Sequence, residues 1–128
     1  MLGNVYDFRG PNKPFDTACA SGFSALHEAV VSLRSGQCDR AIVVGLNLCL
    51  RAATQNQFLN LNMISPDGHC KCLDDDANGY AKGEACVVLV LQKKSEAKRI
   101  YAKSNYGGSS IVLYYIIFLY YFSCPHQN

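Results

Sequence analysis

Two uninterrupted apolar runs constrain the fold of this chain more than any other feature. Residues 41–46 read Ala-Ile-Val-Val-Gly-Leu, and residues 85–91 read Ala-Cys-Val-Val-Leu-Val-Leu. Short runs rich in β-branched residues, without polar alternation, are typical of strands that are buried on both faces, as in a parallel or mixed sheet. The sequence therefore predicts two strands of one sheet with layers on each side.

The segment before the first run has the periodicity of a helix. Between Ser21 and Arg34 the apolar residues recur every three or four positions, and Gly36 follows where helices commonly end. Residues 15–18 follow Pro14, which favours extended geometry before it, and we expect this short run to be a strand. Strand, helix and strand in this order predict a βαβ crossover and an α/β fold.

The remaining segments carry weaker signals. Residues 47–64 are partly helical at best, residues 65–68 (Ser-Pro-Asp-Gly) predict a turn, and residues 74–83 predict a polar loop before the second strand. Residues 93–99 are charged and expected to be exposed. Residues 111–123 are almost purely aliphatic and aromatic but follow neither period, and they are shorter than the roughly 17–25 residues of a membrane helix. We expect no membrane association.

Composition limits the classes of function. The 128 residues suffice for one small core, and 49% of them are hydrophobic. The net charge is +2 and the basic residues are dispersed, which disfavours nucleic acid as a partner. The seven cysteines are odd in number, and the N-terminus has no signal-peptide pattern. These features predict reduced thiols and a cytoplasmic location.

Cys19 is the residue best placed for chemistry. It lies between the expected extended run and the expected helix, where a turn can present a nucleophile. A helix N-terminus favours the thiolate, and the Cys19 N–H is a possible donor to an oxyanion. The small neighbours Ala18, Ala20 and Gly22 leave room for a substrate. A buried structural thiol is the alternative, and position alone does not decide between them.

Two other patterns resemble metal sites. Residues 74–79 (Asp-Asp-Asp-Ala-Asn-Gly) match the first six positions of a calcium-binding EF-hand loop, but position twelve is Ala85 and not glutamate. His69, Cys70 and Cys72 suggest zinc, but no second ligand pair follows at a usable distance. We predict no metal site and no directly bound cofactor.

Several segments together resemble the β-ketoacyl synthase family. Gly10-Pro11 and then Asp16–Gly22 (Asp-Thr-Ala-Cys-Ala-Ser-Gly) are similar to the family's nucleophile segment. Further similarities, in the family's order, occur at residues 37–47, at 64–71 and at 74–84, which end in Gly-Tyr-Ala-Lys-Gly-Glu. Asn47-Leu-Cys-Leu and Gln92-Lys93 resemble animal multifunctional fatty acid synthases. Polyketide synthases remain an alternative.

The resemblance implies a partial thiolase-like fold, a mixed sheet with a buried helix after the nucleophile cysteine. It covers residues 3–103, and residues 104–128 form a tail without resemblance to the family. It implies that Cys19 accepts an acyl group from the phosphopantetheine arm of an acyl carrier protein, and that malonyl carrier protein is then decarboxylated and condensed with it. The substrates would be acyl and malonyl thioesters. The intact family is homodimeric.

The family also uses two histidines in later segments. This sequence has only His27, His69 and His126, and none lies in such a segment. The resemblance therefore implies a truncated fragment that is inactive in condensation by itself. A non-catalytic product, at most an interaction fragment, is the alternative function.

Overall fold

The computed structural model describes residues 2–103 and 111–123, and for Leu2 and residues 111–123 it describes the backbone alone. The chain divides into two compact units. The first comprises Met1–Gly45 and Val87–Phe118, and the second comprises Leu46–Cys86 and Leu119–Asn128.

The described residues form three helices and four strands. The helices are α1 (Leu2–Val5), α2 (Ser21–Arg34) and α3 (Ala52–Asn60), with single 3₁₀ turns at Ala18–Ala20 and Lys94–Glu96. The strands are β1 (Arg40–Asn47), β2 (Gly83–Lys93), β3 (Ala102–Lys103) and β4 (Ile111–Ser123). The predicted helix over 21–34 and the predicted strands over 41–46 and 85–91 are confirmed.

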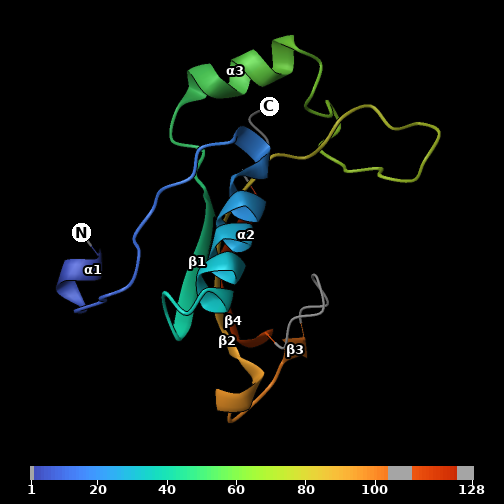
Figure 1. Ribbon diagram of the computed structural model, residues 1–128. Coiled ribbons are helices and arrows are strands. Elements are labelled where there is room, and N and C mark those ends of the chain that lie inside the picture. The colour runs from blue at the N-terminus through green and yellow to red at the C-terminus, as the bar shows by residue number, and fades with distance from the viewer. Residues whose placement is uncertain (1, 104–110, 124–128) are drawn as a thin grey trace. The chain divides into compact units, whose positions relative to one another are not determined.

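The strands form one sheet in the order β1-β2-β4-β3. At the end of β1, the side-chain amide of Asn47 donates to the carbonyl of Gly83, at the beginning of β2, over 2.6 Å. These neighbouring strands therefore run in opposite directions (Figure 1). Strands β3 and β4 pair antiparallel, with Ala102 opposite Leu113. The sequence did not predict β4, and the rest of the expected tail, 104–110 and 124–128, lies outside the described residues.

Helix α2 ends as its sequence predicts. Gly36 has φ +75°, and the Gln37 N–H donates to the Ser32 carbonyl over 3.0 Å. This six-to-one hydrogen bond is the Schellman arrangement, which requires a left-handed residue that glycine adopts without steric cost. The chain then turns back into β1.

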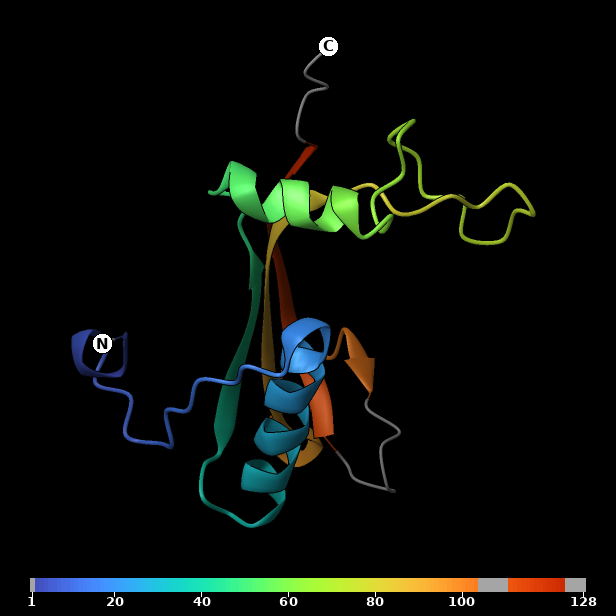
Figure 2. The ribbon, with the colours of Figure 1, turned by 90° about the horizontal axis from the view of Figure 1, so that it is seen from above.

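The core of the first unit lies between α2 and the sheet. Val30 and Leu33 of α2 are buried together with Val43 of β1 and Leu91 of β2. Partly buried apolar residues pack against them: Ala25, Leu26, Ala29, Cys38, Ala41 and Leu89. Both ribbon views show α2 running alongside β1 (Figures 1 and 2). The core therefore fixes the helix that follows Cys19.

Two expectations about this region are wrong. Residues 15–18 form no strand, and the chain from residue 8 to residue 17 is irregular before the 3₁₀ turn. Strand β1 is also not buried on both faces. Val43 is buried against α2, whereas Ile42, Val44 and Leu46 are 51%, 46% and 61% exposed. The alternating side chains of β1 thus have one covered face, because none of the described segments packs on the other.

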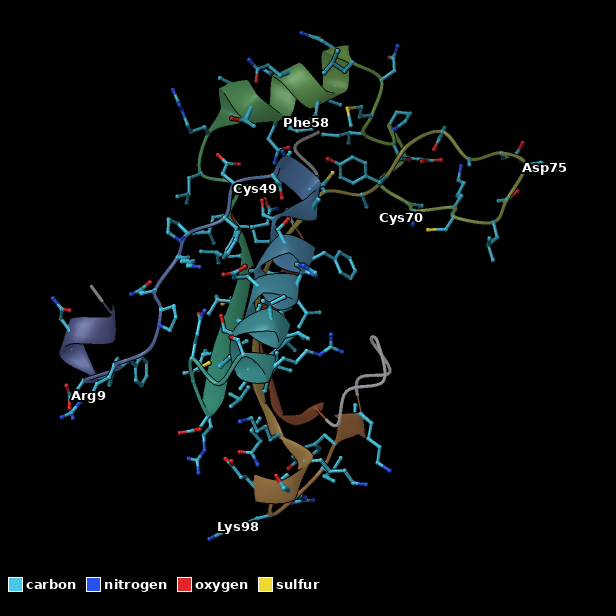
Figure 3. All side chains as sticks on the ribbon, in the orientation of Figure 1. Arg9, Cys49, Phe58, Cys70, Asp75 and Lys98 are labelled. Carbon is cyan, nitrogen blue, oxygen red and sulfur yellow. The ribbon has the colours of Figure 1, made fainter. Side chains whose placement is uncertain are left out.

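The second unit contains α3 and a long loop closed by backbone hydrogen bonds. Figure 3 shows Phe58 on α3 and Asp75 at the outer end of the loop. The Lys82 ammonium lies 3.9 Å from the centre of the Phe58 ring, which is a favourable cation–π distance. Within the described residues, no helix is both long enough and apolar enough to span a bilayer.

Candidate functional site

The candidate nucleophile lies immediately before α2. Cys19 is the central residue of the 3₁₀ turn Ala18–Ala20, and α2 begins two residues later at Ser21. Its side chain is free and exposed. The predicted position at the beginning of the helix is therefore confirmed, and the alternative of a buried structural thiol does not fit this exposure.

The backbone of this turn is unusual one residue before Cys19. Ala18 has φ +52°, in the left-handed region that residues with a Cβ rarely occupy. Such a conformation costs about 1–2 kcal/mol per residue and persists where surrounding contacts impose it. The turn that carries Cys19 therefore needs local contacts that hold it.

The Ser21 side chain supplies two of these contacts. Its Oγ accepts the Thr17 N–H over 2.9 Å and donates to the Ala18 carbonyl over 2.7 Å. The Ser21 N–H also donates to the same carbonyl. One serine thus connects the residue before the left-handed position to that position itself, across the turn that presents Cys19.

A pair of hydroxyl groups connects the residue before this turn to the first turn of α2. Thr17 Oγ1 and Ser24 Oγ are 2.9 Å apart, and either can be the donor. Further upstream, Lys13 forms an ion pair with Glu28 of α2 over 2.5 Å. These contacts were not predicted from the sequence. The available signal was the Ser and Thr content around a helix start, where such side chains bond to local backbone.

Cys38 differs from Cys19 in its surroundings. It is half-buried beside the core of the first unit. Burial, and then the charge of Asp39, raise the pKa of the Cys38 thiol, and the opposing effect of Lys93 is smaller. Because the thiolate is the reactive form, Cys38 is a poor nucleophile at neutral pH.

The other described cysteines belong to the second unit or its boundary. Cys49 and Cys86 are half-buried, whereas Cys70 and Cys72 are exposed. The Cys70 sulfur accepts the Ala81 N–H over 3.0 Å, which ties the loop to the segment before β2. The six cysteines that the structure describes are free thiols.

The predicted turn at residues 65–68 is confirmed in the second unit. The Gly68 N–H donates to the Ser65 carbonyl over 3.2 Å, and Gly68 has φ +71°. Asp67 of this turn accepts hydrogen bonds from the side chains of Lys71, Ser65 and Asn78. In that order of importance, these donors hold the pKa of Asp67 well below its usual range.

Three further hydrogen bonds close the second unit. The Ser65 N–H donates to the Tyr80 carbonyl, and the Tyr80 N–H donates to the Met63 carbonyl, each over 3.0 Å. The Glu84 carboxylate accepts the Cys49 N–H over 2.6 Å. Residues of the segments singled out at 64–71 and 74–84 therefore form a structural network, and nothing in it resembles a catalytic pair.

Neither metal pattern gathers ligands in space. Asp74 instead forms a local turn, in which its side chain accepts the Asp76 N–H over 3.2 Å. Over residues 2–103, no three histidine, cysteine or acidic side chains lie close enough together to hold a metal ion.

The described histidines occupy separate places in the chain. His27 lies on α2 of the first unit, and His69 lies in the loop of the second unit. His126 lies outside the described residues. The site that the structure supports is therefore the Cys19 turn itself, with Thr17, Ser21 and Ser24 around it.

Comparison with known proteins identifies what this arrangement is similar to. Residues 1–97 match the model of the β-ketoacyl synthase N-terminal domain. The chain is 50% identical over 109 residues to the fatty acid synthase of the goose Anser anser anser, which covers 85% of this chain and 31% of that protein. It is 45% identical over 101 residues to the highly reducing polyketide synthase alnA of Emericella nidulans, which covers 76% of this chain and 4% of that protein.

Solved structures give the same result for the fold. A ketosynthase domain of the oxazolomycin system of Streptomyces albus superposes with a TM-score of 0.70 at 30% identity, over 73% of this chain and 17% of that one. The module 6 ketosynthase of the Bacillus subtilis bacillaene synthase superposes with a TM-score of 0.67 at 27% identity, over 80% of this chain and 22% of that one. The predicted α/β class and partial thiolase-like fold are confirmed. The chain spans less than a third of the length of these relatives.

Proposed function

The chain belongs to the β-ketoacyl synthase family, and on this premise we propose that it provides the nucleophile-bearing part of a ketosynthase of fatty acid synthesis, in which Cys19 accepts the acyl group. The observation that carries the proposal is the exposed Cys19 thiol on a turn held at the beginning of α2. The relatives named fatty acid synthase and polyketide synthase support the class of reaction.

The proposed step is an acyl transfer between two sulfurs. The Cys19 thiolate attacks the carbonyl carbon of an acyl thioester carried on phosphopantetheine of an acyl carrier protein. A bond forms between the Cys19 sulfur and that carbon, the original carbon–sulfur bond breaks, and the released pantetheine thiolate takes up a proton. Splitting condensation into this transfer and a later attack by a malonyl-derived carbanion is the advantage of covalent catalysis.

The proposal includes a division of labour. The second step requires groups that stabilise the developing negative charge, and loss of one such group typically reduces the rate by about 10²–10³. The three histidines of this sequence lie outside the segments in which the family carries its own two. We therefore assign acyl transfer to this chain. We assign condensation to an assembly that contains those histidine segments, and we propose that this assembly is a homodimer.

The proposed setting is the cytoplasm. The six described cysteines are free, which is the state that a reducing compartment maintains. Cys19 also requires a free thiol for the proposed transfer.

Intact mass spectrometry tests the proposal. The purified chain is incubated with a short acyl-pantetheine thioester at neutral pH, with Cys19→Ala and Cys70→Ala as variants. Because both cysteines are exposed, the Cys70 variant controls for non-specific acylation. We expect one acyl adduct on the unmodified chain and on the Cys70 variant, and none on the Cys19 variant.

Addition of malonyl carrier protein separates the two steps. We expect no ketoacyl product from the acylated chain. Absence of the acyl adduct, while Cys19 still reacts with iodoacetamide, would contradict the proposal and favour a non-catalytic interaction fragment. Ketoacyl product that depends on Cys19 would show that the assigned division of labour is wrong.

A further inference from the structure

We propose that Ser21 is a positioning residue for Cys19, because its hydroxyl holds Ala18 in the left-handed conformation that sets the direction of the next side chain. The inference rests on the proposed function in one respect, namely that Cys19 is positioned for acyl transfer. The geometry itself stands on the contacts of Thr17, Ala18 and Ser21.

The turn before Cys19 has a conformational cost. Ala18 at φ +52° has a Cβ, so its conformation is unfavourable unless neighbouring groups compensate. Glycine would adopt the same angle without that cost. The chain has alanine at this position, and the turn therefore depends on the contacts that span it.

Ser21 forms hydrogen bonds on both sides of this turn. Its Oγ accepts the N–H of Thr17, the residue before Ala18. The same Oγ donates to the Ala18 carbonyl, which lies on the C-terminal side of the Ala18 Cα. Rotation of Ala18 out of the left-handed region would move these two backbone groups relative to one another and break at least one of the bonds. No other described side chain bonds to both groups.

The turn is joined directly to Cys19. The Ala18 carbonyl belongs to the peptide unit whose nitrogen is that of Cys19, so fixing this carbonyl fixes the plane from which the Cys19 side chain departs. The Thr17–Ser24 hydroxyl pair fixes the other end of the segment to α2. Cys19 is thereby held exposed immediately before α2, where its sulfur is accessible to a reagent or substrate.

The chain offers a matched control at the other end of the same helix. Ser35 Oγ donates to the Ser32 carbonyl over 3.2 Å, beside the C-terminus of α2. Ser35→Ala therefore removes a hydroxyl-to-backbone hydrogen bond of the same kind, without touching the Cys19 turn. Cys38 provides an internal probe of unfolding, because it is half-buried next to the core.

The experiment measures alkylation rates of individual cysteines in the whole chain. The chain and its variants are treated with limiting iodoacetamide at neutral pH, and the label is located by peptide mass. For Ser21→Ala we expect the Cys19 rate to fall about three- to tenfold, the effect of losing one hydroxyl that makes two hydrogen bonds. We expect Ser21→Thr, which keeps the hydroxyl, to restore the rate, and Ser35→Ala to leave it unchanged.

A double-mutant cycle with Ala18→Gly tests the cause. If Ser21 acts by holding a left-handed residue, its removal should matter less when that residue is glycine, and we expect the effect of Ser21→Ala to shrink to less than about twofold. A merely structural role would not produce this dependence on residue 18.

The proposal is overturned by any of four results. These are an unchanged or higher Cys19 rate in Ser21→Ala, a rise in Cys38 labelling in the same variant, no restoration by Ser21→Thr, and an equal effect of Ser21→Ala in the glycine background. Alkylation requires no acyl substrate, so these results are independent of the acylation assay. If Cys19 alkylation depends on Ser21 as expected but no acyl adduct forms, the proposed function is contradicted and the positioning role of Ser21 stands.

Discussion

The first unit, which carries Cys19, buries apolar side chains. The second unit is instead closed by hydrogen bonds around Gly79. Four apolar residues are buried among those whose side chains the structure describes, Val30, Leu33, Val43 and Leu91, and they belong to the first unit. Among the described residues of the second unit, Ser65 alone is buried, and α3 buries none. Substitutions of the same type should therefore have different effects in the two units.

Removal of a buried leucine should give the largest effect. Leu33 is 0% exposed, and Leu33→Ala leaves a cavity between α2 and the sheet, which costs about 2–5 kcal/mol of stability. Leu59→Ala is the matched substitution on α3, where the side chain is 48% exposed, and we expect a change within about 0.5 kcal/mol. Urea unfolding followed by far-ultraviolet circular dichroism measures both. Equal costs would mean that the contrast between the units is wrong.

The sequence predicts the first unit better than the second because burial leaves a periodic pattern. The bounds of α2 follow from its apolar spacing and from Gly36, and β1 and β2 extend the predicted runs by only one or two residues at each end. In the second unit, α3 has no buried residue, so its sequence carries no strong period. Its hydrogen bonds connect residues far apart in the chain, such as Cys49 with Glu84.

Two failures of prediction have other physical causes. A strand requires a neighbour that accepts its backbone hydrogen bonds, and residues 15–18 have none among the described segments, although their composition allowed an extended run. In the site, the place of Cys19 before the helix was predictable, and the resemblance of residues 16–22 to the family's nucleophile segment singled it out. The hydrogen bonds of the Ser21 hydroxyl across the turn were not predictable, because they depend on a positive φ at Ala18 that an alanine does not indicate.

An alanine substitution at Gly79 should break the second unit selectively. Gly79 has φ +134°, and an added Cβ would lie 2.5 Å from the Ser65 nitrogen, so the bridge between Ile64 and Tyr80 cannot persist. We expect a local cost of about 1–3 kcal/mol. Hydrogen exchange should show lost protection at the Ser65 and Tyr80 amides, with Val43 in β1 unchanged.

Gly22 in α2 provides the opposite case for the same substitution. A Cβ there meets nothing within 4 Å, and Gly22→Ala in a helix should stabilise the first unit by about 0.5–1 kcal/mol. Destabilisation by Gly22→Ala would contradict the open space around Gly22. Exchange at Val43 that rises with Gly79→Ala would contradict the local character of the Gly79 effect.

The smallest effect should come from acidification of the second unit. The Lys71 ammonium lies 2.6 Å from the Asp67 carboxylate and, with Ser65 and Asn78, holds the pKa of Asp67 well below its usual value of about 4. A depressed folded-state pKa contributes stability that is present above about pH 4 and is lost as the pH falls through the folded-state pKa. The first unit has no part in this network, so acid should loosen the turn at residues 65–68 first.

Carboxyl carbon NMR during an acid titration measures this effect. We expect Asp67 to remain ionised well below pH 4 in the unmodified chain, and Lys71→Met to return its pKa toward the usual range, because the first of its donors is then absent. Lys13→Met removes an exposed ion pair of the first unit and is the matched control, with no expected change at Asp67. An Asp67 that titrates near pH 4 in the unmodified chain would mean that Lys71, Ser65 and Asn78 do not act together in solution. The turn would then be maintained by Pro66 and Gly68 alone, and the second unit would owe its structure to backbone geometry and not to charge.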